Sequence, residues 1–222
     1  MSDEPLPPAP VLDRAPAFGL FSLLSGAASV LVLIARLQPT PRSAAGQLAY
    51  FAGHQGLVAL EAVVLLVWAV FSVPLVVALG QILRPKSPAF ALSATLLSAV
   101  GVLLLGFAMF AHVGALLSII AAGGPPNAAD AIYQAAVWGA LSLYLTEPGL
   151  MSWGLGQLLF GWLAWRSHVL PNWVSIVGSI GGIAGLLTLA VYQAGMLALV
   201  QLASFAVWGF ATGIHLLRRR QA

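Results

Sequence analysis

Long runs of apolar residues with almost no charge constrain this chain more than any other feature of its sequence. The stretch 53–83 contains one charged residue, Glu61, and the stretch 89–122 contains none. Runs of about 18 or more apolar residues are typical of transmembrane helices, because about 20 residues cross the hydrocarbon of a bilayer. Only 7% of all residues are charged, compared with about 25% in soluble domains. The chain is therefore predicted to be an integral membrane protein without a separate soluble domain.

The breaks between the apolar runs predict an all-α transmembrane bundle with about six spanning helices. Each predicted span ends near prolines, glycines or basic residues. The predicted spans cover residues 17–37, 53–83, 89–122, 150–165, 173–193 and 196–217. The proline-rich residues 1–16 are predicted to form a disordered cytoplasmic tail, and 218–222 a basic one. Residues 17–217 would then form a single transmembrane domain.

The segment 128–145 allows two interpretations. Asn127 and Asp130 suit a capped helix start, and the sequence Thr-Glu-Pro-Gly at 146–149 should end that helix. If the segment does not cross the bilayer, seven basic residues face the cytoplasm (Arg14, Arg84, Lys86, Arg166, Arg218, Arg219 and Arg220) and two lie outside (Arg36 and Arg42). If it does cross, the split is six to three. The positive-inside rule favours the first case, so we expect both termini in the cytoplasm and 128–145 at, or dipping into, the outer interface.

A few polar side chains within the spans share helical faces with small residues. A polar side chain on such a face points toward neighbouring helices rather than toward lipid. Counting about 1.5 Å per residue places Glu61, His112 and Gln157 about 10–15 Å below the outer surface, with Gln201 shallower. These depths predict a ligand-binding pocket in the outer half of the bundle, with five candidate residues: His54, Glu61, His112, Gln157 and Gln201. The alternative for Glu61 is a hydrogen-bonding group that only holds helices together.

The predicted fifth span is rich in glycine. Gly178, Gly181, Gly182 and Gly185 form two pairs with a spacing of four residues. Small residues at this spacing allow transmembrane helices to approach closely. We therefore predict close helix packing inside the bundle along this face, and a homodimer interface is the alternative.

Several kinds of cofactor chemistry lack the residues they need. The chain has no cysteine, which excludes Fe–S clusters and thiolate metal sites. The single lysine, Lys86, falls in a predicted loop, which excludes a covalently bound retinal inside the bundle. His54 lies about 10 Å outward of His112 in depth, which argues against a bis-histidine haem, and no set of three converging metal ligands is evident. The remaining sequence features do not identify a cofactor.

The segment 157–178 has the sequence QLLFGWLAWRSHVLPNWVSIVG. Here a helix ends at Arg166-Ser167, a turn contains Leu170-Pro171, and a glycine-rich helix follows. This pattern resembles the uncharacterised bacterial six-helix membrane family known as domain of unknown function 4386, with a specific match over about 30 residues and agreement in outline elsewhere. Asn172-Trp173 depart from it, because little positive charge follows the proline. The resemblance implies a bacterial inner-membrane protein of unknown activity, and it supplies no catalytic residues.

These features favour a non-catalytic membrane protein that binds a small apolar or amphipathic molecule, or that serves as an accessory subunit of a membrane complex. The alternative is a redox enzyme or quinone-binding subunit that uses Glu61 and His112. A transporter is the third possibility. Ion-coupled transport usually shows several buried charges and internal repeats, whereas this sequence shows one buried acid, Glu61, and no convincing repeat. The expected partners are the lipid bilayer and, beyond it, other membrane subunits or a second copy of the chain. The basic residues cluster at the ends of apolar runs, so nucleic acid is not an expected partner.

Overall fold

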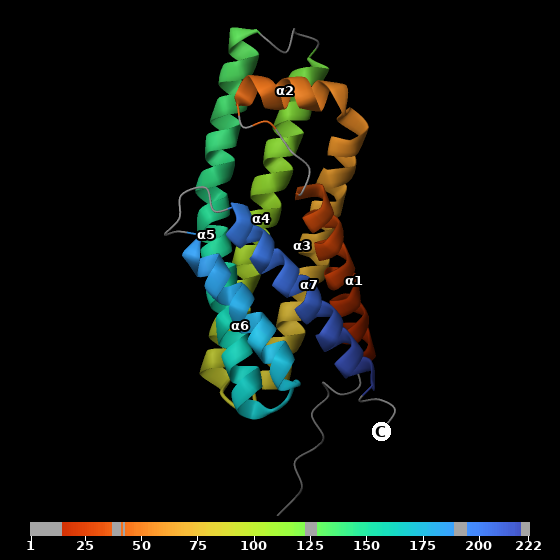
Figure 1. The fold of residues 1–222 in the computed structure, drawn as a ribbon, viewed down its shortest axis with the longest axis vertical. Coiled ribbons are helices and arrows are strands. Elements are labelled where there is room, and N and C mark those ends of the chain that lie inside the picture. Colours follow the sequence, from red (N-terminus) through yellow and green to blue (C-terminus); the bar gives the residue numbers. More distant parts are fainter. Residues whose placement is uncertain (1–14, 37–40, 42, 123–127, 189–194, 219–222) are drawn as a thin grey trace, which may run out of the picture.

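Six helices of the chain pack side by side in a ring (Figure 1). The computed structural model describes residues 15–36, 41, 43–122, 128–188 and 195–218, and these residues form seven α-helices and no strand. The ring consists of α1 (Ala15–Arg36), α3 (Gln55–Leu83), α4 (Pro88–Ala121), α5 (Ala129–Ser167), α6 (Asn172–Leu187) and α7 (Gly195–Arg218). Consecutive helices of the ring run in opposite directions and pack on each other, and α7 packs on α1. The predicted all-α helical bundle is thus confirmed.

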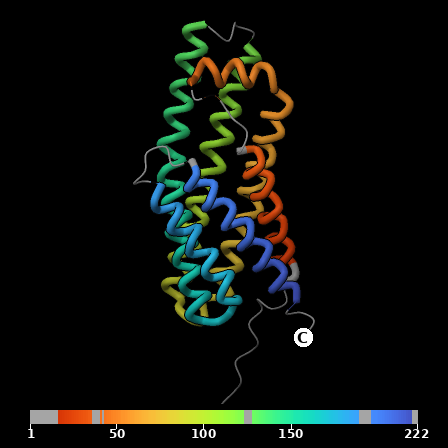
Figure 2. The backbone as a smooth tube through the Cα atoms, viewed as in Figure 1, coloured from red at the N-terminus to blue at the C-terminus, as the bar shows by residue number. Residues whose placement is uncertain are grey.

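The helices of the ring differ in length, which divides the molecule into two parts (Figure 2). Helices α3, α4 and α5 have 29, 34 and 39 residues, and at about 1.5 Å per residue they measure about 44, 51 and 58 Å. Helices α1, α6 and α7 have only 22, 16 and 24 residues. The long helices therefore continue beyond the short ones at one end, which we call the long-helix end. We call the opposite end, where α1 starts and α7 finishes, the basic end.

The short helix α2 (Ala44–Gly53) crosses the long-helix end at a steep angle to the ring (Figure 1). Its first turn is capped by Ser43, whose hydroxyl accepts a hydrogen bond from the backbone N–H of Gly46 at 3.1 Å. Leu48 and Phe51 of α2 belong to a small apolar cluster with residues of α3, α4 and α5. Residues 44–53 lie almost entirely outside the predicted spans, because a helix of 10 residues is too short to cross a bilayer.

Helix α5 differs from the prediction for this region. The segment 128–145 was expected to form a separate interfacial helix, but it is the first half of one continuous helix that passes through Pro148. A proline removes one backbone N–H and strains the preceding turn, yet neighbouring helices can hold the chain in place. Directly after Pro148, Gly149 and Trp153 pack against Gly101 of α4. This contact explains how the helix continues where its local sequence predicts an end.

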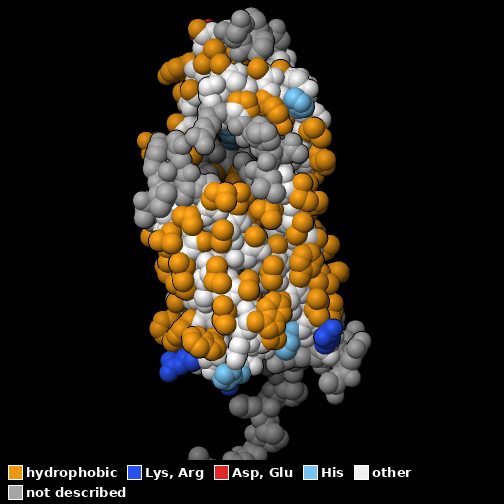
Figure 3. Space-filling model, viewed as in Figure 1, with side chains coloured by type: hydrophobic (Ala, Val, Ile, Leu, Met, Phe, Trp, Pro, Cys, Tyr) orange, Lys and Arg blue, Asp and Glu red, His pale blue; other side chains and the backbone are white. Residues whose placement is uncertain are grey.

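Four described helices are each long and apolar enough to cross a membrane: Ala17–Ala35, Gln55–Leu83, Pro88–Ala121 and Met196–Arg218. Helix α6 is a shorter apolar helix, and residues 189–193 of the predicted fifth span lie outside the described residues. Apolar side chains cover much of the outer surface of the helices (Figure 3). Such a surface is stable in lipid rather than in water, so the described helices indicate a membrane protein.

Candidate ligand-binding site

The interior of the ring contains a cavity of about 270 Å³. This volume lies just below the range of about 300–1,000 Å³ that is usual for ligand pockets. Five helices contribute to its wall: α1, α3, α4, α5 and α7. The lining residues are Val32, Leu65, Trp68, Leu105, Met109, Leu150, Trp153, Ala198, Leu199 and Leu202. The wall is therefore apolar and partly aromatic, which suits a hydrocarbon or ring system rather than a charged molecule.

Aromatic side chains close the cavity on the side of the basic end. Trp68 and Trp153 meet edge to face with ring centroids 5.4 Å apart, and Phe205 lies 4.9 Å from Trp153. Trp208 and Phe160 continue this stack below Phe205. All five side chains are buried. The interior below the cavity is thus filled, and the cavity is a dead end rather than part of a passage through the ring.

The two cavity tryptophans differ in their hydrogen bonding. The indole N–H of Trp68 donates to the hydroxyl of Ser29 on α1 at 2.9 Å. The indole N–H of Trp153 is buried and has no hydrogen-bond partner among the described residues. A buried donor without a partner costs about 1–3 kcal/mol. Trp153 therefore leaves an unused donor in the wall of an apolar cavity.

Two of the predicted site residues lie one helical turn beyond the cavity wall, toward the long-helix end. Glu61 precedes Leu65 by four residues on α3, and His112 follows Met109 by three residues on α4. Residues three or four apart on a helix share one face. Both side chains are half-buried. We call these two positions, one turn beyond the cavity wall toward the long-helix end, the polar rim.

Gln157 and Gln201 lie elsewhere, behind the cavity wall between α5, α6 and α7. Both are fully buried. The amide nitrogen of Gln201 donates to the carbonyl oxygen of Leu150 at 3.3 Å. Neither amide atom of Gln157 has a hydrogen-bond partner among the described residues. Gln201 therefore ties α7 to α5 behind the cavity, and neither glutamine lines it.

The five predicted residues thus do not form a single pocket. His112 packs close to Gly139 of α5, and Gln157 follows 18 residues later (139 to 157) in the same helix, about 27 Å further along. The prediction that His112 and Gln157 lie at the same depth is wrong, because it assumed that a new helix starts at Leu150. His54 is exposed at the junction of α2 and α3, where its Nδ1 lies 2.9 Å from the carbonyl oxygen of Tyr50 and its ring stacks on Tyr50.

The glycines of α6 serve two different purposes. A Cβ atom added to Gly182 would come within 2.6 Å of the backbone nitrogen of Leu158, so this glycine lets the backbones of α5 and α6 touch. A Cβ atom at Gly181 would meet the amide of Gln157, and one at Gly185 would meet Gln201. A Cβ atom at Gly178 would lie 3.3 Å from the indole nitrogen of Trp208. These three glycines make room for buried polar side chains.

Two features of the structure were missed in the sequence. Glycines at a spacing of four or seven residues also join α1 to α7, namely Gly19, Gly26, Gly209 and Gly213, and this spacing could have revealed them. The apolar cavity wall carries no such signal, because its residue types are those of any helix interior. Among the described residues, no three His, Cys, Asp or Glu side chains lie close enough together to hold a metal ion.

Comparison with known proteins gives one match. The sequence model of a protein family described as "Domain of unknown function (DUF4386)" matches residues 17–219. The search of curated proteins found no match, and the search of solved structures found none.

Proposed function

The chain belongs to the DUF4386 family, and we propose that it is a membrane protein that binds one small amphipathic molecule inside its ring of helices. The observation that carries this proposal is the apolar cavity of about 270 Å³ with its aromatic floor and polar rim. The lining residues have no titratable group, which favours binding over catalysis. The closed floor favours a binding protein over a transporter.

The geometry suggests the chemistry of the ligand. Its apolar part would lie against Trp68, Trp153 and Leu202, since an apolar wall of this kind disfavours charge. Its polar group would reach the rim, where Glu61 supplies hydrogen-bond acceptors and His112 supplies a donor or an acceptor. A linear molecule with a hydroxyl group at one end fits both requirements.

The charge pattern suggests how the chain sits in the membrane. The described Arg84, Lys86, Arg166 and Arg218 follow or end the helices at the basic end. The positive-inside rule would place this end in the cytoplasm, in a bacterium at the inner membrane. The cavity residues lie about 20–30 Å from this end by residue count, which corresponds to the outer half of a hydrocarbon layer about 30 Å thick. The ligand would then enter from the outer leaflet or the outer aqueous phase.

Tryptophan fluorescence tests the cavity directly, because Trp68 and Trp153 belong to its wall. The purified protein in detergent is titrated with 10-bromodecan-1-ol, whose bromine quenches an indole that it contacts. We expect saturable quenching in the wild type. Ala198→Phe should remove most of the saturable component, since Ala198 lines the cavity and a benzyl group would fill part of it.

Val200→Phe is the matched control, because Val200 lies on the same helix with its side chain exposed. The fluorescence of the Val200→Phe protein should show the same saturable quenching by 10-bromodecan-1-ol as that of the wild type. Quenching that rises linearly without saturation, or that Ala198→Phe and Val200→Phe leave equally unchanged, would show that the probe partitions only into the detergent and that the cavity binds nothing.

A further inference from the structure

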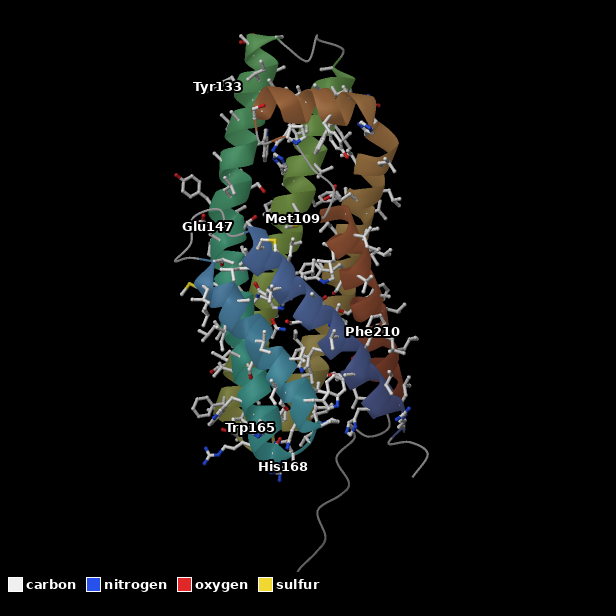
Figure 4. All side chains as sticks on the ribbon, viewed as in Figure 1. Met109, Tyr133, Glu147, Trp165, His168 and Phe210 are labelled. Carbon is white, nitrogen blue, oxygen red and sulfur yellow. The ribbon has the colours of Figure 1, made fainter. Side chains whose placement is uncertain are left out.

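A second hollow lies at the basic end, on the outside of the ring. It is a groove of about 500 Å³ between the first turns of α6 and the last turns of α7. Trp173, Val207, Phe210 and Ile214 form its apolar walls, and the polar lining residues, His215 and Arg218, lie near its mouth at the end of α7. Figure 4 labels Phe210, which belongs to α7. The groove is separate from the cavity described above and shares no lining residue with it.

The groove exists because α6 and α7 diverge toward the basic end (Figure 1). Further from this end the two helices touch closely, where Gly185 meets Gln201 and Gly181 meets Ser204. Toward the basic end, the large side chains of Trp173 and Phe210 take the place of glycine. Helices that approach through small residues separate where large ones stand between them.

The length of the groove matches one leaflet of a bilayer. Val207 and Arg218 are eleven residues apart on α7, which corresponds to about 16 Å along the helix. Half of a hydrocarbon layer about 30 Å thick is about 15 Å. With Arg218 at the membrane surface, the apolar walls would therefore reach the middle of the bilayer, as an acyl chain does.

The charge at the basic end, where the groove lies, is positive. Besides Arg218, the described Arg84, Lys86 and Arg166 lie at this end of the molecule. The described acidic residues, Glu61, Asp130 and Glu147, all lie at least about 30 Å from the basic end by residue count. Basic pockets between transmembrane helices are suited to the headgroups of anionic lipids. Trp173, half-exposed beside the mouth, has the amphipathic ring that favours the membrane interface.

We propose that this groove binds an anionic glycerophospholipid. Its phosphate pairs with Arg218, and one acyl chain lies along Phe210 and Ile214 toward Val207. The acyl chain supplies the apolar area that a soluble phosphate lacks, so the occupant is a lipid of the bilayer rather than a phosphate ion from solution.

Native mass spectrometry of the full chain tests the site. The protein is reconstituted into nanodiscs of phosphatidylcholine and phosphatidylglycerol with equal acyl chains, and the lipids retained after release are counted. We expect the wild type to retain one phosphatidylglycerol in preference to phosphatidylcholine. Arg218→Gln should lower this preference roughly fivefold, the effect expected for one basic residue near an anionic surface. Ala211→Phe, which fills the groove, should abolish retention of either lipid there.

Two controls separate a site from a merely basic surface. Arg84→Gln removes one charge at the same end outside the groove, and Ala89→Phe adds a ring to an exposed position on α4. Both should retain phosphatidylglycerol like the wild type. A loss with Arg84→Gln equal to that with Arg218→Gln would overturn the proposal, as would equal retention of the two lipids by the wild type. Displacement of the retained lipid by millimolar glycerol 3-phosphate would overturn the acyl-chain part.

Discussion

Trp68 of α3 donates its indole N–H to the hydroxyl of Ser29 on α1 across 39 positions of sequence, at 2.9 Å. The same hydroxyl donates to the carbonyl oxygen of Ser25 at 2.7 Å, and Ser25 and Ser72 join the two helices one turn away at 2.8 Å. Trp68 is also part of the cavity wall. The polar contact between α1 and α3 therefore fixes the orientation of a ring against which the proposed ligand would lie.

Ser29→Ala should destabilise the protein by about 1 kcal/mol, because it leaves the buried indole N–H of Trp68 without an acceptor. Hydrogen bonds between transmembrane helices contribute about 0.6 kcal/mol on average and up to about 1.7. Unfolding in mixed detergent and SDS micelles, followed by circular dichroism, measures this difference. Ser118→Ala is the control, since the exposed Ser118 bonds only within its own helix. Equal stabilities of the two variants would mean that the Trp68–Ser29 bond contributes nothing.

Gly182→Ala should cost about 1–3 kcal/mol of unfolding free energy, the usual effect of overpacking. The new methyl group would lie 2.6 Å from the backbone nitrogen of Leu158 and 2.7 Å from the carbonyl oxygen of Gly154, and backbone atoms cannot move aside as a flexible side chain can. Gly114→Ala is the control, because a Cβ atom there has open space. It should be neutral or stabilise α4 by up to about 1 kcal/mol. The reverse order of stabilities would contradict the close α5–α6 contact.

A cross-link can test the continuous course of α5, and the absence of cysteine from the chain makes the experiment clean. Cysteines placed at His112 and Gly139 should join readily through a short bis-maleimide, because a Cβ atom at 139 lies 3.7 Å from the ring of His112. Cysteines at His112 and Gln157 should not join. If the second pair reacted and the first did not, the helix would have to break near Pro148 after all.

Glu61→Leu should weaken binding of 10-bromodecan-1-ol roughly tenfold, since it removes hydrogen-bond acceptors from the rim at a cost of about 1.5 kcal/mol. Glu61→Gln keeps an amide oxygen in nearly the same place and should retain most of the affinity. Binding of 1-bromodecane, which has no hydroxyl group, should be the same in all three proteins. An equal loss for both probes would assign Glu61 a role in holding the helices rather than in recognising a polar group.

Reporter fusions can test the orientation. A reporter after Ala222 should be active in the cytoplasm, because the basic residues gather at the end where α7 finishes. A reporter inserted at 123–127, between α4 and α5, should be active outside. Activity of the C-terminal reporter on the outer side would place the basic end outside and reverse the proposed entry route of the ligand.

The fold was predictable to the extent that apolar runs and their breaks determine helices. The boundaries near Leu83, Pro88 and Arg218 agree with the prediction within a few residues, because Pro85 and the basic residues stop the helices locally. The course of α5 was not predictable in this way. Its continuity through Pro148 depends on the packing of Trp153 against Gly101 of α4, a contact between residues far apart in the sequence.

For the candidate site, the sequence could point only to polar side chains within apolar spans. Glu61 and His112 stand out from that background, and both positions lie one helical turn beyond the cavity wall. Gln157 and Gln201 stand out equally, yet they lie behind the wall, since position along a helix depends on where that helix starts. The cavity itself is lined by residues such as Leu105 and Met109, and nothing in the sequence separates a leucine that lines a cavity from one that fills the core.

The fit between Gly181 and Gln157 has a consequence for redesign of this protein. A methyl group at 181 would fall 2.7 Å from the amide nitrogen of Gln157, so the volume taken by the glutamine is the volume that the glycine gives up. The same exchange of volume links Gly185 with Gln201. Each glycine and its glutamine therefore share one fixed volume. An engineered sequence that places a larger residue at the glycine position of α6 has to replace the facing glutamine with a smaller residue at the same time.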